Sequence, residues 1–413
     1  MNRLQNFILV FLLLSGCAKK EKKEIELSLF YWGDSEEINI MKRMAEAFET
    51  ENTGIDVKLI HANNYQDKLQ VMIGGGIPPD VFYLEAVDIP AYASTLVDIE
   101  PFLEDDTLWN PDDYFEALLK GFEYEGKFYG IPKDWTPLVL YYNKALFDEA
   151  GVSYPDGSWD WQALLKAAKR LTKDLDGDGK PDQFGIYYYT SWLFPLFPWI
   201  WSNGGRILSE DRKRCVIDSP ETVEALQFLA DMRWKYGVTP TPVQIAQRDL
   251  FTTGRVAMLI MGRWGVPRYR TIKDFEWDIA PVPKNKCRAT SIASVAFVIS
   301  AKCKYPKEAY RLAMFLSGEE GNRIIARMGL GVPSIKEIAY SEDFLTPDEP
   351  PAHGEVFLDA AKYGRLEPTV PQWREMANII GTELDKVWLN HNSAEEVCKE
   401  LVPKVNKLLA GSE

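Results

Sequence analysis

The chain has 413 residues, of which 61 are acidic and 47 basic, so its formal net charge is −14. This acidic balance argues against nucleic acid as a partner, because phosphate backbones are recognised by basic patches. The hydrophobic fraction of 46% supplies ample core, and the length is typical of two or three domains.

The first 24 residues have the pattern of an export signal followed by a polar tether. Arg3 supplies a positive charge, and residues 7–14 form an apolar run shorter than the ~20 residues that span a bilayer. The sequence LSGC, which ends at Cys17, is similar to the lipobox of bacterial lipoproteins and implies cleavage before Cys17 and its modification by lipid, palmitate included. We therefore expect a lipoprotein signal peptide at 1–16, a charged tether at 17–24 and anchoring to the bacterial cell envelope, in the periplasm or on the outer face of the membrane. The alternative is an ordinary signal peptide with an incidental cysteine.

Residues 25–100 repeat a strand–helix pattern. Strands are predicted at 25–32, within TGIDVKLIHAN after a stop at its start, and at 80–86. Helices are predicted at 38–48 and 65–73, the first of them opened by Asp34-Ser35-Glu36-Glu37. Strands that alternate with helices in this way predict a parallel sheet, and ligands of such sheets lie beyond the carboxyl ends of the strands. The side chains at these ends are Trp32, Asp34, His61, Asn63, Glu85 and Asp88.

The middle and the end of the chain continue the α/β pattern with many aromatic residues. Strands are predicted in the segments FEWDIAPVP and SVAFVISAK. Helices are predicted at 161–172, 220–234, 247–254, 306–316, 373–388 and 394–409.

Tryptophans carry the clearest functional indication. The chain has 13 of them, and Trp32, Trp135, Trp199, Trp201 and Trp264 stand at strand ends or beside proline, glycine and asparagine. An indole in a cleft can stack on the apolar face of a pyranose while carboxylates and amides bind its hydroxyls. The alternative for each ring is core packing.

The segment DLDGDGKPD has the spacing of a calcium-binding loop. Its acidic residues match positions one, three, five and nine of such a loop, but Gly185 stands where an EF-hand has its bidentate glutamate. A polar turn is the alternative to a structural calcium site. The loop residues predicted to take part are Asp174, Asp176, Asp178, Lys180 and Asp182.

Enzyme signatures are scarce in the sequence. It contains no G-x-S-x-G and no H-E-x-x-H motif, and its cysteines form no CxxC pair that would indicate zinc. Four cysteines follow Cys17, and their spacing leaves both disulfides and free thiols open. We predict a protein that performs no catalysis and requires no cofactor, with a two-carboxylate surface glycosidase as the competing class.

Five segments together resemble extracellular solute-binding proteins of family 1, the sugar-binding subunits of ABC importers, which are related to maltose-binding protein. The segments are NNYQDKLQVMIGGGIPPDVFYLEA, WTPLVLYYNKALFDEAGV, WDWQALLKAAKRLTKDLDGDGKPDQFG, GRVAMLIMGRWGVP and GVPSIKE. The resemblance implies a periplasmic-binding-protein-like fold of two α/β lobes with a hinge and an interlobe cleft. Lobe one would comprise 25–132 and 280–316, and lobe two 133–279 and 317–413.

The resemblance also implies a function and a site. The protein would capture a sugar or oligosaccharide between its lobes, close around it and deliver it, as a monomer, to a membrane permease. A polyamine or a glycerophosphodiester is the alternative ligand on the same fold. The residues implied to bind ligand are Trp32, Asp34, Asn63, Glu85, Asp134, Trp135, Trp199, Trp201, Asn203, Trp264 and Trp373.

Overall fold

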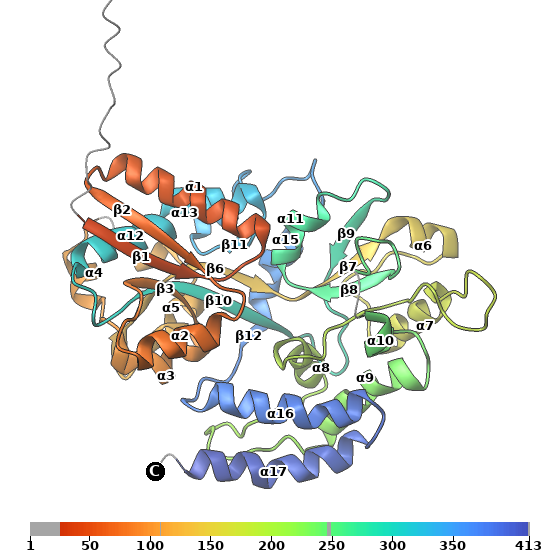
Figure 1. The fold of residues 1–413 in the computed structure, drawn as a ribbon. Helices are drawn as coiled ribbons and strands as arrows, with labels where there is room; N and C mark the ends of the chain where they lie inside the picture. The colour runs from red at the N-terminus through yellow and green to blue at the C-terminus, as the bar shows by residue number, and fades with distance from the viewer. Residues whose placement is uncertain (1–24, 108, 246–248, 412–413) are drawn as a thin grey trace, which may run out of the picture.

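The computed structural model describes residues 25–107, 109–245 and 249–411. The predicted signal peptide, the tether and the lipidation site Cys17 lie outside these ranges. Figure 1 shows two α/β lobes, one around β1, β2 and β3 on the left and one around β7, β8 and β9 on the right, with the two C-terminal helices below.

Lobe one is built on a seven-stranded sheet. Its strands are β1 (Ile25–Tyr31), β2 (Ile55–His61), β3 (Val81–Glu85), β6 (Gly130–Pro137), β10 (Thr290–Ile299), β11 (Val332–Pro333) and β12 (Gly364–Leu366). They follow the order β11-β6-β10-β3-β1-β2, and β12 pairs with β10. β1 runs parallel to β2 and β3, as predicted, whereas β10 runs antiparallel to β3 and β6.

Helices cover both faces of this sheet (Figure 1). They are α1 (Ser35–Glu51), α2 (Tyr65–Gly74), η1 (Ala86–Asp88), α3 (Ile89–Tyr92), η2 (Ala93–Thr95), α4 (Glu100–Asp105), η3 (Pro111–Asp113), α5 (Glu116–Gly121), α12 (Pro306–Ser317) and α13 (Glu319–Met328), with a hairpin of β4 (Glu123–Tyr124) and β5 (Lys127–Phe128). Apolar residues of α1 at helical spacing, Met41, Met44 and Phe48, join Leu29 and Phe82 in the lobe-one core.

Lobe two surrounds a three-stranded antiparallel sheet with the strand order β8 (Met258–Met261), β7 (Val139–Asn143), β9 (Trp277–Ala280). Its helices are α6 (Lys144–Ala150), α7 (Trp161–Leu171), η4 (Phe194–Leu196), α8 (Phe197–Ser202), α9 (Pro220–Trp234), α10 (Pro242–Ile245), η5 (Arg263–Gly265), α11 (Val266–Tyr269), α14 (Lys336–Ala339), α15 (Glu355–Asp359), η6 (Ala360–Lys362), α16 (Trp373–Trp388) and α17 (Ala394–Ala410). The lobe-two core includes Trp161, Trp199, Leu229, Ile380 and Leu401.

Two long strands carry the chain between the lobes. β6 and β10 pair along their length, with Ile131 and Phe297 in the lobe-one core and Trp135 and Ile292 in a third cluster at the junction. Their register shifts between Val295 and Ala296, which locally interrupts the ladder.

The packing places two of the lobe boundaries later in the chain than predicted. Val282 and Ala289 belong to the lobe-two core, so the return to lobe one comes within β10 rather than at residue 280. α13, which the prediction put in lobe two, contacts α1 and α12, and Ile325 joins the lobe-one core. In both cases apolar side chains pack into the core of one lobe before the chain crosses to the other lobe.

Most predicted elements match the observed ones closely, including α9 and α16 at both ends. The helix predicted at 247–254 is wrong over its described part, because residues 249–254 form turns in which Asp249 accepts hydrogen bonds from the backbone of Phe251 and Thr252.

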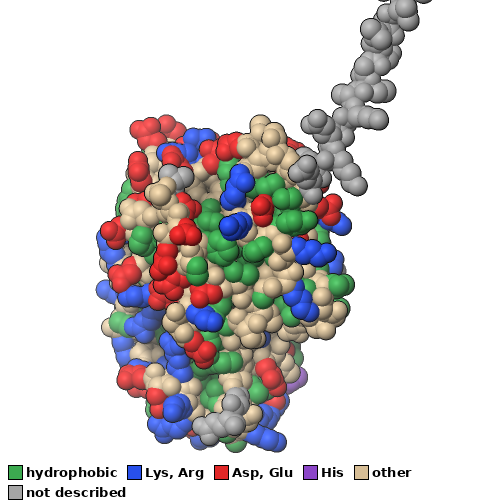
Figure 2. Space-filling model, turned by 90° about the vertical axis from the view of Figure 1, so that its left-hand side faces the viewer, with side chains coloured by type: hydrophobic (Ala, Val, Ile, Leu, Met, Phe, Trp, Pro, Cys, Tyr) green, Lys and Arg blue, Asp and Glu red, His purple; other side chains and the backbone are tan. Residues whose placement is uncertain are grey.

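The described cysteines, Cys215, Cys287, Cys303 and Cys398, are free thiols. Acidic side chains gather in a band on the lobe-one end of the molecule (Figure 2).

Across the described ranges, every helix is too short or too polar to serve as a membrane span.

Candidate functional site

The carboxyl ends of β1, β2 and β3 bring the predicted lobe-one residues to one edge. Asp34 caps α1 by accepting hydrogen bonds from the backbone N–H groups of Glu36 and Glu37 at 3.1 and 3.2 Å. The partly buried Trp32 packs edge-on against Tyr65 and Tyr83, with ring centroids 4.7 and 4.9 Å away.

The turn between Trp32 and Asp34 has little freedom. Gly33 has φ +141°, and a β-carbon there would lie 2.5 Å from Oε2 of Glu37. His61 approaches the Gly33 carbonyl through Nε2 at 2.8 Å, so the ends of β1 and β2 are tied together. Asn63, the next predicted residue, is exposed just beyond β2.

The end of β3 binds an arginine of lobe two. Arg374 at the start of α16 donates from Nε and Nη2 to the two oxygens of Asp88, both at 2.6 Å, and Nη2 also contacts Glu85. Asp88 is 1% exposed, and besides this bidentate pair its carboxylate accepts a hydrogen bond from the Gln66 amide at 3.4 Å. Burial opposes the charge of Arg374, but Glu85 and Asp88 outweigh it and raise the pKa of the guanidinium.

A buried ion triad lies beneath this edge, where β6 crosses. Lys133 is 3.2 Å from Glu37 and 3.0 Å from Asp134, and its ammonium stands 4.5 Å from the Tyr83 ring centroid. Burial opposes the charge of Lys133, but Asp134, Tyr83 and Glu37 raise its pKa well above the ordinary value. Asp134, which was predicted to bind ligand, is thus paired with Lys133.

Lobe two presents aromatic rings to lobe one. Trp264, in the turn after β8, packs against both the lobe-one core and the lobe-two core. Trp192 is 49% exposed and stands perpendicular to Trp264 at a ring distance of 6.4 Å, and Tyr189 lies 6.3 Å from Trp192. Two indoles at a right angle offer flat apolar faces to a ligand held between the lobes.

Gly262 fixes the position of the Trp264 ring. A β-carbon at residue 262 would lie 2.1 Å from an atom of that ring. Gly262 also accepts a hydrogen bond through its carbonyl from the hydroxyl of Tyr141 at 2.9 Å. The G-R-W sequence therefore brings the indole against bare backbone, which only glycine allows.

A second arginine links the lobes beside these rings. Arg268 on α11 contacts Asp34 of lobe one at 3.2 Å and Asp249 of lobe two at 3.4 Å. Its side chain is 47% exposed, so each contact contributes little to stability and mainly orients the groups.

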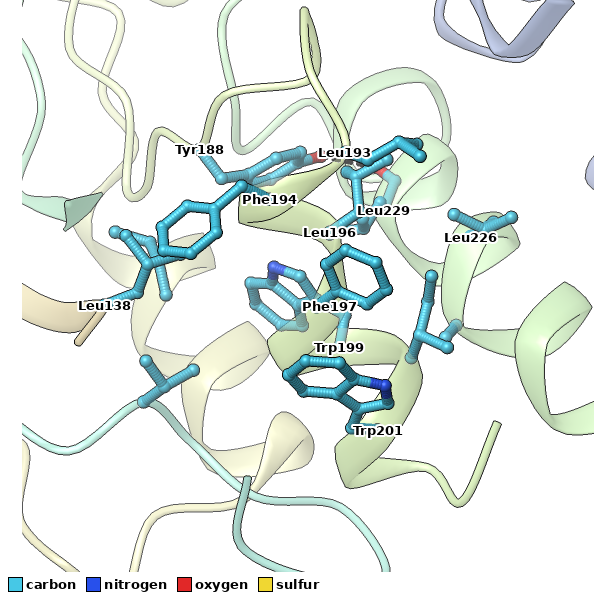
Figure 3. Packing of buried hydrophobic residues seen from close by; sticks show 14 of the residues in the cluster. Leu138, Tyr188, Leu193, Phe194, Leu196, Phe197, Trp199, Trp201, Leu226 and Leu229 are labelled. Atoms are coloured by element: carbon cyan, nitrogen blue, oxygen red, sulfur yellow. Dashed lines mark hydrogen bonds between the residues drawn. The ribbon is translucent and has the colours of Figure 1, made fainter. Parts of the chain in front are cut away.

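Several predicted binding residues are instead buried in the structure. Trp135 is 1% exposed and donates from its indole N–H to the Pro333 carbonyl. Figure 3 shows Trp199 and Trp201 within the packed lobe-two core, where Phe197 stacks on Trp201 and on Trp373. The Asn203 amide is satisfied by Glu221, Glu224 and Asn285. Trp135, Trp199, Asn203 and Trp373 hold the fold, whereas Trp201, which is 6% exposed, also lines the pocket described below.

A pocket of about 520 Å³ adjoins the Asp88–Arg374 pair. It is lined by Ala86 and Ile89 of lobe one, and by Trp201, Arg206, Arg365 and Glu367 on the other side. Burial, Glu85 and Asp88 raise the pKa of Glu367 to about 8, although Arg374 opposes them. Glu367 is therefore largely protonated at neutral pH and can donate a hydrogen bond.

The predicted calcium loop gathers carboxylates on the far part of lobe two. One oxygen from each of Asp174, Asp176 and Asp182 lies within 4.8 Å of the others. Asp174 accepts from the backbone N–H groups of Gly177 and Gly179, and Asp178 accepts from Lys180.

Sequence reasoning missed five residues that lie between the lobes, namely Tyr189, Trp192, Asp249, Arg268 and Arg374. Trp192 lies in the aromatic segment 187–205, whose local pattern does not show which ring faces the other lobe. Arg374 follows Trp373 directly on a helix, and successive helical side chains point about 100° apart, so a buried Trp373 directs Arg374 elsewhere. That inference was available only once the burial of Trp373 was known.

The chain resembles known binding proteins in both sequence and structure. The family model described as bacterial extracellular solute-binding protein matches residues 32–323. An ABC substrate-binding protein from Listeria monocytogenes, solved in complex with cycloalternan, superposes with a TM-score of 0.87 at 28% identity, covering 94% of this chain and 99% of that one.

Curated relatives agree with this likeness over most of their length. The galactooligosaccharide-binding protein of Bacillus subtilis is 24% identical, with 92% of this chain and 90% of the relative covered. The diacetylchitobiose-binding protein of Streptomyces coelicolor is 26% identical, covering 84% of this chain and 81% of the relative. The predicted two-lobed α/β fold is confirmed, and the chain belongs to the bacterial extracellular solute-binding protein family, whose members serve ABC transporters.

Proposed function

We propose that this protein captures an oligosaccharide between its lobes and delivers it to the permease of an ABC importer. The observation that carries the proposal is the position of Trp264, which packs against both cores while the exposed Trp192 stands perpendicular to it. Rings from lobe two would stack on sugar faces. The carboxylates Asp34 and Glu85 from lobe one, which are partly exposed, would accept hydroxyl hydrogen bonds.

Contacts across the junction support a mechanism based on closure. Arg268 and Arg374 of lobe two both reach carboxylates of lobe one, so bringing the lobes together completes these pairs. A ligand that contacts both lobes stabilises the closed form relative to the open form, and the permease recognises the closed form.

The relatives support a carbohydrate as the ligand. Their names and titles refer to galactooligosaccharide, diacetylchitobiose and cycloalternan, all carbohydrates. We further propose that the protein acts as a monomer and catalyses no reaction. We also propose that the export signal directs it out of the cell and that a lipid on Cys17 anchors it to the cell envelope.

A thermal-shift screen tests the sugar proposal. Neutral mono- and oligosaccharides at ~100 times their dissociation constant should stabilise the protein by ~2.7 kcal/mol. Trp264→Ala should lose most of this response. Trp234→Ala, which removes a 39%-exposed indole at the end of α9, serves as the matched control and should keep it. If no sugar of the panel raises the melting temperature, the proposal is contradicted. Turnover of the sugar during a day of incubation would contradict the proposed absence of catalysis.

We also propose that residues 174–182 bind a structural Ca²⁺. Three carboxylates within 4.8 Å repel one another, and a hard cation with oxygen ligands would relieve that repulsion. Calcium should raise the melting temperature of the parent protein but not that of Asp176→Asn, and chelator should reverse the rise. Equal melting curves with calcium and with chelator contradict this proposal.

A further inference from the structure

Three of the cations at the junction of the lobes each stand between two carboxylates. Lys133 pairs with Glu37 and Asp134. Arg268 pairs with Asp34 and Asp249, and Arg374 pairs with Asp88 and Glu85. Every such group therefore has a formal charge of −1, despite its cation.

The hydrogen-bonding capacity of these cations is already directed at protein carboxylates. Arg374 uses Nε and Nη2 on Asp88 and Glu85, and Arg268 uses one terminal nitrogen on each of its two partners. Lys133 is 3% exposed and enclosed by its partners and by Tyr83. Recognition of an anionic group normally uses a free guanidinium fork, and the forks of Arg268 and Arg374 are both occupied.

The same groups favour a ligand that donates hydrogen bonds. A carboxylate offers about four lone-pair sites across its two oxygens, so a carboxylate that is paired with an arginine keeps acceptor capacity for a hydroxyl. A protonated amine would in addition be attracted by the net charge of −1, whereas another carboxylate would be repelled in a partly desolvated site.

From this arrangement we infer that the site selects neutral and amine-bearing sugars and discriminates against sugars that carry carboxylate, sulfate or phosphate groups. The inference rests on the proposed function, since it defines the class of sugar that the interlobe site admits. The Arg268 and Arg374 triads are the specificity-determining groups, and the buried Lys133 triad adds its charge from beneath them. The aromatic rings contribute stacking that is indifferent to ligand charge.

The test uses one sugar in three charge states. Isothermal titration compares the tightest neutral oligosaccharide of the screening panel with its C6-oxidised uronate form and its 6-amino form. We expect the uronate form to bind at least tenfold more weakly than the neutral form, and the amine form to bind at least as tightly. Raising the salt concentration should narrow both differences, because screening weakens the underlying charge interactions.

A variant that lacks one carboxylate tests which group causes the discrimination against the uronate form. Asp249→Asn removes one carboxylate beside Arg268 and should reduce the neutral-to-uronate affinity ratio severalfold. Asp105→Asn makes the same change on exposed α4, at the outer edge of lobe one (Figure 1), and should leave the ratio unchanged.

The outcomes separate this inference from the proposed function. Uronate affinity equal to neutral affinity overturns the inference and leaves sugar capture standing. A ratio that Asp249→Asn, Asp34→Asn and Asp88→Asn all fail to change overturns the assignment of selectivity to the triads. Failure of every neutral sugar to bind overturns sugar capture, and the inference with it.

Discussion

Lobe two contains two groups of aromatic rings that differ in environment. Trp199, Trp201 and Trp373 are between 0% and 6% exposed, whereas Trp192 is 49% exposed and Trp264 is only partly buried. The buried rings lie on the helices α8 and α16, which pack into the core. Trp192 lies in an irregular segment before η4, and Trp264 lies in the short 3-10 helix η5 after β8. Among these five rings, the α-helices bury their indoles, and the short segments present theirs to the other lobe.

This difference implies separate energetic roles. A buried ring lowers the free energy of the folded state through apolar burial and contacts on all sides. A ring with a hydrated face gains that free energy only when a ligand covers the face. Substitutions in the two groups should therefore affect stability in one case and affinity in the other.

The largest effect that follows is on stability. Trp199→Ala should lower the free energy of unfolding by about 3–5 kcal/mol, because it opens a cavity among Trp161, Tyr188 and Phe228. Urea denaturation followed by circular dichroism measures the loss. The fraction that remains folded should bind sugar with the parent affinity, and a folded variant that cannot bind would place Trp199 in the site.

The neighbours Trp373 and Arg374 allow the sharpest comparison, since adjacent residues belong to different groups. Arg374→Gln leaves the buried Asp88 without its cation and should weaken sugar binding by about 1–3 kcal/mol, which is roughly 5- to 150-fold. Trp373→Phe keeps an apolar ring in the core and should mainly lower the melting temperature. Titration calorimetry and thermal melts on both variants would show the reverse pattern if the roles were assigned wrongly.

A smaller effect should follow from moving the Trp264 ring without removing it. Gly262→Ala forces the ring away from its position, because the new β-carbon would lie 2.1 Å from it. We expect about a tenfold loss of affinity, equivalent to ~1.4 kcal/mol. Gly381→Ala on α16, where a β-carbon meets nothing within 4 Å, is the control and should keep the parent affinity. Unchanged binding by Gly262→Ala would show that the ring position does not matter.

Local patterns in the sequence predict the elements of both groups but not the environment of each ring. The strand predicted at 25–32 and the helix start at Asp34 depend on neighbouring residues alone, and both are observed, as β1 and as the cap of α1. Trp199 and Trp192 stand in one aromatic segment, and only the packing of α8 against α9 separates core from surface. Charge partners are equally remote, since Arg374 lies 286 residues from Asp88.

The last predicted effect concerns the charge of Glu367, which lines the pocket beside the Asp88–Arg374 pair. Glu367 in the folded protein holds its proton up to a pKa of about 8, because burial, Glu85 and Asp88 disfavour a further negative charge, although Arg374 opposes them. In the unfolded chain the same carboxyl ionises near 4.5. Between these values the folded state binds more protons than the unfolded state, so stability falls as pH rises from about 4.5 to about 8.

Glu367→Gln removes this dependence, because the amide stays neutral throughout. Its melting temperature relative to the parent should therefore rise from pH 5 to pH 8, while exposed Glu104→Gln on α4 should run parallel to the parent. Parallel curves for Glu367→Gln would mean that Glu367 ionises freely, and the site would then carry one more negative charge at neutral pH. That outcome would strengthen the rejection of anionic sugars while removing a hydrogen-bond donor from the pocket beside Asp88.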